Sequence, residues 1–296
     1  MKIIHSYWSK PYIKNIREGY GGWSDKGFHY MSQALSCLKY KEFYKTELIT
    51  DAKGYEVLIE LLKLPYDNVH IILDKINKYP EGAWALGKLY SYKIQNEPFI
   101  HVDSDSYIWS KFPSSIEESG LIAQEFEIGY EINSIYYKKL ERKLPYIPKS
   151  ITNYHSANNI KETQINAGLF GGNDIQFIQK FADEAFNFIT LNPYNKLSKN
   201  IPSWVYNTYF EQFLFYCLAL EANKKITCLL SEETKENINK TGCIDIFQIP
   251  FNNKFIHYAG DAKRNPSLAL QMSQRLYYEY PEYYFKIKNL IKQRII

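Results

Sequence analysis

The sequence predicts an α/β fold, and two features carry that prediction. Short apolar runs alternate along the 296 residues with longer segments of helical periodicity. The composition is also that of an ordinary globular chain, with 45% hydrophobic and 23% charged residues, which excludes a disordered or collagen-like chain. We expect a single domain, residues 1–265, in which helices flank a Rossmann-like mixed central sheet. A basic, aromatic helical tail, residues 266–296, should pack on this domain or extend from it.

The strands are predicted from apolar runs that turn residues bound on both sides. In chain order these runs are residues 2–7, 47–50, 69–73, 99–102, 121–126, 165–171 and 254–258. Helical periodicity covers residues 28–39, 55–62, 82–95, 174–189, 208–222 and 267–296, the last broken at Pro281. A glycine-rich loop is expected at 18–27. Residues 138–163 and 191–202 are predicted as irregular insertions around a site, because regular elements resume on each side.

Charge and cysteine content narrow the classes of partner and compartment. The net charge is +4, and residues 261–296 carry all of it, so general nucleic-acid binding is not expected. The cysteines Cys37, Cys217, Cys228 and Cys243 lack C-x-x-C spacing and indicate reduced thiols of a cytoplasmic protein. We expect neither a secretory signal nor a membrane span, since the N-terminus lacks an apolar region and no run approaches ~20 apolar residues.

The first chemical signal is His-Val-Asp-Ser-Asp, in which Asp103 and Asp105 directly follow an apolar strand. In an extended backbone residues i and i+2 point the same way, so both carboxylates should face one spot. Two carboxylates at the carboxyl edge of a strand can hold Mg²⁺ or Mn²⁺ beside phosphate oxygens. The alternative is a solvated turn, because Asp-Ser-Asp is common turn chemistry.

A second signal lies late in the chain, where His257 ends a strand and Gly260 and Lys263 follow at spacings of three. An imidazole can complete a metal site begun by two aspartates. A glycine allows close backbone approach to a diphosphate, and a lysine supplies a charge for its oxygens. The alternatives are a half-buried histidine with a backbone partner and a solvated lysine.

A third signal combines the strand Ile-Asn-Ala-Gly with a polar pair on an aromatic helix. Asn166 can present an amide to sugar hydroxyls, while Ala167 and Gly168 leave room for a ring. Glu211 and Gln212 interrupt an aromatic-rich stretch, which indicates a cavity-facing pair. The alternative is an ordinary exposed helix surface.

Together these segments resemble the GT-A-fold glycosyltransferases, and most closely the retaining galactosyltransferase and glycogenin-like group. The resemblance rests on the D-x-D, the Asn-Ala-Gly strand, the Glu211-Gln212 pair and an H-x-x-G-x-x-K matched at His257, Gly260 and Lys263. It runs from about residue 2 to residue 263. The sequence departs from the group at three points: Lys88 stands where the group often has Arg, Arg264-Asn265 where Pro-Trp is usual, and Glu211 where the group has Asp.

The resemblance implies a function and a set of site residues. The function is a metal-dependent transfer of a hexosyl group from a nucleoside diphosphate sugar, most simply a UDP-sugar, to an unidentified acceptor hydroxyl, with retention of configuration. The implied metal is Mn²⁺ or Mg²⁺, with Asp103, Asp105 and His257 as ligands. The other implied residues are Gly260, Lys263 and Lys88 for the diphosphate, Gln212 and Glu211 for catalysis, Asn166, Ala167, Gly168, Gln124 and Glu125 for the donor sugar, and Ser6, Tyr7, Thr50, Asp51 and Ser104 for the nucleoside.

Two other functions fit parts of the same pattern. A nucleotidyltransferase also uses acidic residues and a metal, but residues 18–27 lack the G-x-x-x-x-G-K-[ST] phosphate loop. A non-catalytic carbohydrate-binding protein would explain the 17% aromatic content, but it would not need the His-Gly-Lys segment.

The tail suggests a further partner. Tyr284, Phe285, Ile287, Ile291 and Ile295 recur at helical spacing, with lysines and an arginine mostly on the other face. Such a helix can lie on an anionic membrane surface, here the inner face, or simply pack on the catalytic domain. We therefore expect a cytoplasmic enzyme whose membrane contact is at most weak and peripheral.

Overall fold

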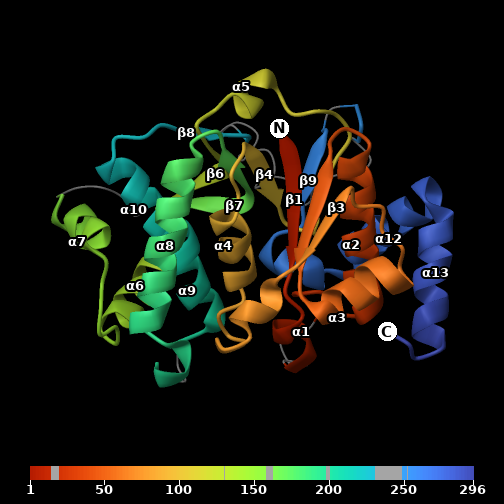
Figure 1. The fold of residues 1–296 in the computed structure, drawn as a ribbon, viewed down its shortest axis with the longest axis horizontal. Coiled ribbons are helices and arrows are strands. Elements are labelled where there is room, and N and C mark those ends of the chain that lie inside the picture. Colours follow the sequence, from red (N-terminus) through yellow and green to blue (C-terminus); the bar gives the residue numbers. More distant parts are fainter. Residues whose placement is uncertain (15–19, 130, 158–162, 198–200, 231–248, 252) are drawn as a thin grey trace. The chain divides into compact units, whose positions relative to one another are not determined.

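The fold was examined in a computed structural model of the chain. It describes residues 1–14, 20–129, 131–157, 163–197, 201–230, 249–251 and 253–296 (Figure 1). Cys243 and part of the predicted loop at 18–27 lie outside these residues. Cys37, Cys217 and Cys228 are free thiols. None of the helices in the described part combines the length and apolar character that a membrane crossing requires.

The prediction of an α/β fold with a mixed sheet flanked by helices is confirmed. Seven strands form one mixed sheet in the order β3-β2-β1-β4-β7-β6-β8, and β5 pairs with β9 in a second sheet. The strands are β1 (Lys2–Tyr7), β2 (Thr46–Thr50), β3 (Asn68–Ile71), β4 (Phe99–Val102), β5 (Ser106–Ile108), β6 (Leu121–Ile128), β7 (Thr163–Gly172), β8 (Ile226–Cys228) and β9 (Phe255–His257).

The chain divides into two compact units, each made of separate segments. Unit 1 contains residues 1–75, 102–112 and the described part of 235–296, and unit 2 contains residues 76–101 and 113–234. The predicted boundary between residues 265 and 266 stays a prediction.

In unit 1, the strands β1, β2 and β3 run parallel, with Tyr7 opposite Thr50 at the carboxyl ends of the first two. Helix α2 (Lys26–Lys41) begins at Asp25, whose carboxylate accepts a hydrogen bond from the Gly27 amide. The helices α12 (Pro266–Glu279) and α13 (Pro281–Lys292) both pack against α2 (Figure 1). The shorter elements of this unit are α1 (Lys10–Lys14), α3 (Ala52–Tyr55), η1 (Glu56–Leu61) and η6 (Gly260–Arg264), and η2 (Leu73–Ile76) ends at the unit boundary.

In unit 2, the strand β6 pairs antiparallel with β7 and parallel with β8. Gly171 in β7 has φ +151°, and a Cβ there would lie 2.2 Å from the Phe99 carbonyl oxygen, so the close approach requires glycine. The helices are α4 (Leu86–Lys93), α5 (Ser114–Glu117), α6 (Glu131–Glu141), α7 (Lys149–Ser156), α8 (Ile175–Leu191), η3 (Tyr194–Lys196), α9 (Ser203–Thr208), η4 (Tyr209–Phe213) and α10 (Leu214–Glu221). Buried aromatic rings pack β7 against α8 and α10, among them Phe170, Phe181 and Phe215.

The prediction of an irregular segment at 138–163 is wrong for its described part, which contains the end of α6 and all of α7. In α7, Ile151 and Tyr154 are buried at a spacing of three, and the helix packs against α10. Its other positions are mostly polar, so the apolar stripe is too narrow to be recognised in the sequence.

Candidate functional site

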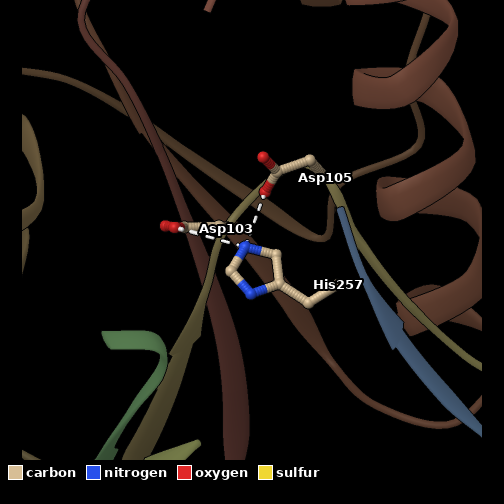
Figure 2. Close-up of side chains that lie close together, drawn as sticks. All are labelled: Asp103, Asp105 and His257. Carbon is tan, nitrogen blue, oxygen red and sulfur yellow. Dashed lines mark ion pairs between the residues drawn. The ribbon is translucent and has the colours of Figure 1, made fainter. Parts of the chain in front are cut away.

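The side chains of Asp103, Asp105 and His257 converge in unit 1 (Figure 2). Strand β5 pairs antiparallel with β9, and the register sets His257 opposite Ser106, the residue after Asp105. The His257 Nε2 atom lies 3.2 Å from Asp105 Oδ1 and 3.9 Å from Asp103 Oδ2. One ligand atom from each residue lies within 4.8 Å of the others, so the three groups can share one cation.

The donor set fits a divalent cation. Two carboxylate oxygens and an imidazole nitrogen are ligand types that divalent cations take in proteins. Asp105 Oδ1 is buried and lies 3.2 Å from His257 Nε2, so its negative charge faces the cluster. The Asp103 side chain is 29% exposed, whereas Asp105 and His257 are buried, so solvent and ligands reach the cluster on the Asp103 side.

The two aspartates converge by a different geometry from the one expected. Residues 103–105 form a turn rather than extended backbone, and the Ser106 amide donates to the Asp103 carbonyl at 3.0 Å. The Ser106 hydroxyl donates to the same carbonyl at 2.7 Å. The expectation that the i, i+2 alternation of a strand aligns the carboxylates is therefore wrong, because a hydrogen-bonded turn does so.

Helix α2 holds this turn through polar residues that the sequence analysis missed. Ser32 donates to the Ser104 carbonyl at 2.7 Å and shares a hydrogen bond with the Tyr107 hydroxyl at 2.8 Å. Gln33 donates to the Ser104 hydroxyl at 2.8 Å. The available signal was Ser32, Gln33 and Ser36 between apolar residues in the middle of the helix, where buried polar groups need partners.

The H-x-x-G-x-x-K segment reaches the same cluster. Lys263 Nζ lies 2.5 Å from Asp105 Oδ2. Gly260 has φ +54°, and a Cβ there would meet nothing within 4 Å, so its surroundings are open. Burial alone would raise the pKa of the Asp105 carboxyl, but the charges of Lys263 and His257 outweigh it and hold the pKa well below its usual range. Asp105 is thus ionised and ready to bind a cation.

Of the residues predicted for the nucleoside, Ser6, Tyr7, Thr50 and Asp51 lie at the ends of β1 and β2, as expected, and Ser104 lies in the turn after β4. Thr50 donates to the Tyr7 carbonyl at 2.8 Å. The buried Asp51 carboxylate accepts hydrogen bonds from the Ser9 amide and hydroxyl and from the Gly54 amide. Asp51 therefore organises its own loop in this structure, and a nucleoside contact through its carboxylate stays a prediction, as do contacts through Ser6 and Ser104.

A buried histidine beside Tyr7 was also missed. Tyr12 stacks on Tyr7 with ring centroids 5.2 Å apart, and the His29 ring lies 5.0 Å from Tyr12. Burial, followed by the charge of Lys263, lowers the pKa of His29 to about 4. This aromatic cluster therefore contains a neutral imidazole that interacts electrostatically with Lys263 and Asp105.

Unit 2 holds the residues predicted for catalysis and for the donor sugar. Glu211 on η4 is 1% exposed, and its Oε1 lies 2.8 Å from Lys88 Nζ on α4. Lys88 also donates to the Ala167 carbonyl at 3.1 Å. Lys88 and Glu211 neutralise each other, so the removal of either side chain would leave the other as an unpaired buried charge.

Gln212 and Asn166 belong to one polar network of unit 2. Gln164 donates to Gln212 Oε1 at 3.0 Å and to Glu127 at 2.5 Å, and Asn166 donates to Glu127 Oε1 at 3.3 Å. Asn166 also accepts a hydrogen bond from the Gly168 amide at 2.9 Å. Glu127 and Gln164 were not predicted, although Gln164 lies two positions before Asn166 and so shares its face of β7.

The donor-sugar residues on β6 are only partly in this network. The register sets Glu125 opposite Asn166 and Glu127 opposite Gln164, with an irregularity between Ala123 and Glu125. Gln124 donates to Glu125 Oε1 at 3.4 Å. Direct roles for Gln124 and Glu125 stay predictions.

Comparison of the whole sequence places the chain in a family. The model of a family of unknown function, DUF6734, matches residues 1–290, so the chain belongs to that family. Among curated proteins, none matches the sequence.

Among solved structures, two of the glycosyltransferase GlyE from Streptococcus pneumoniae TIGR4 are similar to this chain. One has 10% identity and a TM-score of 0.45, covering 99% of this chain and 64% of that chain. The apo form has 11% identity and a TM-score of 0.42, covering 99% and 63%. This chain therefore spans less than two thirds of their length. Similarity at this level does not by itself assign an activity.

Proposed function

We propose that this protein is a metal-dependent glycosyltransferase of the hexosyltransferase type, using a nucleoside diphosphate sugar, most simply a UDP-sugar. The observation that carries the proposal is the meeting of two distant motifs in unit 1, where Asp105 contacts Lys263, 158 positions later. Two carboxylates, an imidazole and an ammonium form the set of groups that a metal-bound diphosphate needs. Neither motif alone requires this arrangement.

In the proposed reaction, the bond between the anomeric carbon and a diphosphate oxygen breaks, a bond to the acceptor oxygen forms, and the hydroxyl proton is released. A Mn²⁺ or Mg²⁺ held by Asp103, Asp105 and His257 would neutralise charge on the leaving diphosphate. Lys263 supplies a further positive charge for the same oxygens, and the open surroundings of Gly260 allow close backbone approach.

Further roles are proposed for unit 2. Gln212 or Glu211 would stabilise positive charge that develops at the anomeric carbon, and Asn166 would orient sugar hydroxyls, beside Ala167 and Gly168. Retention of configuration is proposed from the resemblance to the retaining group. Contact of Lys88 with the diphosphate is proposed on the same basis.

The acceptor and the surroundings of the enzyme also belong to the proposal. The acceptor supplies a hydroxyl, and the enzyme acts in the cytoplasm. We propose that the exposed part of the C-terminal tail makes weak contact with an anionic membrane surface. Tyr277, Tyr278 and Phe285 are 41%, 75% and 50% exposed and form one aromatic group.

The function is tested with a panel of UDP-sugars, Mn²⁺ and the purified chain, by measuring UDP and pyrophosphate release. We expect Mn²⁺-dependent UDP release, and a loss of about a hundredfold or more in Asp105→Asn, because the substitution removes a ligand charge without changing the side-chain volume. Asp183→Asn is the matched control, since its carboxylate is 60% exposed and pairs with Lys93, which is not one of the candidate residues.

Other results would support other functions. Pyrophosphate release would indicate a nucleotidyltransferase, and sugar-nucleotide binding without either product would indicate a binding protein. Where UDP is released, an NMR spectrum of the product shows whether the anomeric configuration is retained. Full activity of Asp105→Asn with unchanged thermal stability would refute the metal assignment.

A further inference from the structure

Lys263 occupies a position that a divalent cation would contest. Its Nζ lies 2.5 Å from Asp105 Oδ2, and the other oxygen of that carboxylate lies 3.2 Å from His257 Nε2. Asp105 and Lys263 are 8% and 17% exposed at their side chains, so little water screens the pair. The ammonium therefore neutralises the same carboxylate that a metal ion would use.

The backbone confines the stem of Lys263. Gly22 has φ +92°, and a Cβ there would lie 2.9 Å from Lys263 Cε. Tyr20 and Trp23 close this glycine turn by an antiparallel bridge, and the Trp23 ring is buried 5.9 Å from that of Tyr258. The turn is thus anchored, and it fits against the lysine because position 22 carries no side chain.

The neighbouring cation is placed quite differently. The Arg264 side chain is 66% exposed and lies 3.5 Å from Asp261, which is itself 93% exposed. Lys263 and Arg264 carry the same charge at adjacent positions, but of these two residues it is Lys263 that contacts Asp105.

A cation at the Asp103–Asp105–His257 cluster and an ammonium on Asp105 repel each other at short range. Each can occupy the carboxylate fully only when the other withdraws. A diphosphate beside the cluster offers the ammonium a second set of anionic oxygens within reach of a flexible four-carbon stem. Withdrawal then becomes favourable when the metal ion and the anion are both present.

We propose that Lys263 is a built-in counter-ion that holds Asp105 in the metal-free protein and moves to phosphate oxygens when a divalent cation and a diphosphate bind together. This inference rests on the proposed metal site. Because Lys263 must be displaced for metal to bind alone, the cation and the diphosphate bind cooperatively. Linkage makes the effect reciprocal, so each ligand raises the affinity for the other by the same factor.

The test measures Mn²⁺ binding to the full chain by calorimetry, first with Mn²⁺ alone and then in the presence of inorganic pyrophosphate. Lys263→Met should bind Mn²⁺ alone about tenfold more tightly than the wild type, because the competing ammonium is gone. Pyrophosphate should strengthen Mn²⁺ binding less in Lys263→Met than in the wild type. Arg264→Met removes the same charge without touching Asp105 and should match the wild type in both measurements.

A second variant disturbs the contact between Lys263 and Asp105 but keeps the charge of Lys263. Gly22→Ala keeps the lysine but pushes its stem away from the turn, so Mn²⁺ alone should again bind more tightly. Thermal unfolding checks that each variant is folded.

The outcomes distinguish this inference from the proposed function. If Mn²⁺ binds the wild type and both lysine and arginine variants change equally, general charge explains the effect and the counter-ion inference is refuted. Weaker binding of Mn²⁺ alone to Lys263→Met refutes it as well. If Mn²⁺ does not bind the wild type at all, the metal site of the proposed function fails, and the inference fails with it.

Discussion

At the scale of single residues, burial decides what two histidines of unit 1 can do. His5 lies between the rings of Tyr40 and Tyr66, and its Nε2 is 2.9 Å from the Ser36 hydroxyl. Burial lowers the pKa of His5 to about 3. Burial, and then the charge of Lys263, lowers the pKa of His29 to about 4. Both side chains are therefore neutral at physiological pH.

This predicts that the protein loses stability in mild acid. Because the folded-state pKa of His5 is depressed, the unfolded chain binds more protons between pH 6.5 and about 3, and the free energy of unfolding falls as the pH falls through that range. Between pH 6.5 and 5 the loss should be about 1–2 kcal/mol for His5. Urea denaturation at a series of pH values measures it.

This test compares the replacement of a buried histidine with the replacement of an exposed one. His5→Asn should reduce the slope of unfolding free energy against pH, whatever it does to stability at pH 7. His70→Asn replaces a histidine with a 47% exposed side chain and should leave the slope as in the wild type. Equal slopes for wild type and His5→Asn would show that His5 is not held neutral by the fold.

At the scale of elements, the geometry of the Asp103–Asp105–His257 cluster depends on how α2 supports the turn after β4. Ser32 binds both the Ser104 carbonyl and the Tyr107 hydroxyl, so one side chain links the helix to the turn and to β5. Neither partner would find a substitute if that hydroxyl were removed, and a buried unsatisfied group destabilises the fold. The helix therefore fixes the aspartates although it supplies no metal ligand.

Ser32→Ala should lower the free energy of unfolding by about 1–3 kcal/mol and weaken Mn²⁺ binding, since the turn that aligns Asp103 and Asp105 becomes looser. Chemical denaturation and calorimetry measure the two effects. Ser156→Ala, at an exposed helix end of unit 2, is the control and should change neither. Unchanged Mn²⁺ affinity in a destabilised Ser32→Ala would mean that the turn keeps its geometry without α2.

The sequence predicts best the elements whose signal is local. Strands β1 and β4 match their predicted ranges, because each is an apolar run bounded by turn residues. The short strands β5 and β8 were missed, since three residues show too little alternation to be recognised, and β9 was predicted only within the longer run at 254–258. The pairing of β5 with β9 nevertheless determines where His257 lies.

The residues of the candidate site likewise divide into those with a local sequence signal and those that only the folded structure brings into contact. Asp103, Asp105 and His257 were predicted from their motifs, and the structure brings them together. Glu127 was missed, because its contact with Asn166 follows from the register of β6 on β7, which the sequence does not reveal. Gly22 was missed because its importance comes from a lysine that lies far along the chain.

At the scale of the whole molecule, the Asp103–Asp105–His257 cluster is assembled from segments that the chain order separates. Residues 102–112 interrupt unit 2 and return to unit 1, where they provide both aspartates. His257 and Lys263 come from the last segment of unit 1. The cluster therefore forms only after distant parts of the chain have met, and local structure alone cannot create it.

That last segment also includes the tail, whose predicted apolar stripe is partly buried and partly exposed. Ile287 is fully buried, and Ile291 packs against the same core of unit 1, so this part of the stripe is structural. Phe285 and Ile295 are 50% and 49% exposed. Truncation after Tyr280 would remove Ile287 from the core and is unsuitable as a test of membrane contact.

Substitutions on the exposed face give a better test. Tyr278 and Phe285 stand on α12 and α13 beside the exposed Lys288 and Lys292, and each cation near an anionic surface contributes ~1 kcal/mol of attraction. The wild type should sediment weakly with phosphatidylglycerol vesicles at low salt and be released at high salt. Tyr278→Ser combined with Phe285→Ser should abolish sedimentation, because the apolar contact is lost while the charge is unchanged.

Leu220→Ser is the matched control, since it removes a 47% exposed apolar side chain from unit 2 and leaves the tail intact. Retained sedimentation of this variant, with loss in the tail variant, would assign the contact to α12 and α13. Equal sedimentation of wild type and tail variant would place any membrane attraction elsewhere on the chain. Absence of sedimentation at low salt would leave the tail with the packing role that Ile287 already demonstrates. Salt screens the attraction between the two lysines and an anionic surface. A face that does not hold the protein on such a surface at low salt will therefore not hold it there at physiological ionic strength.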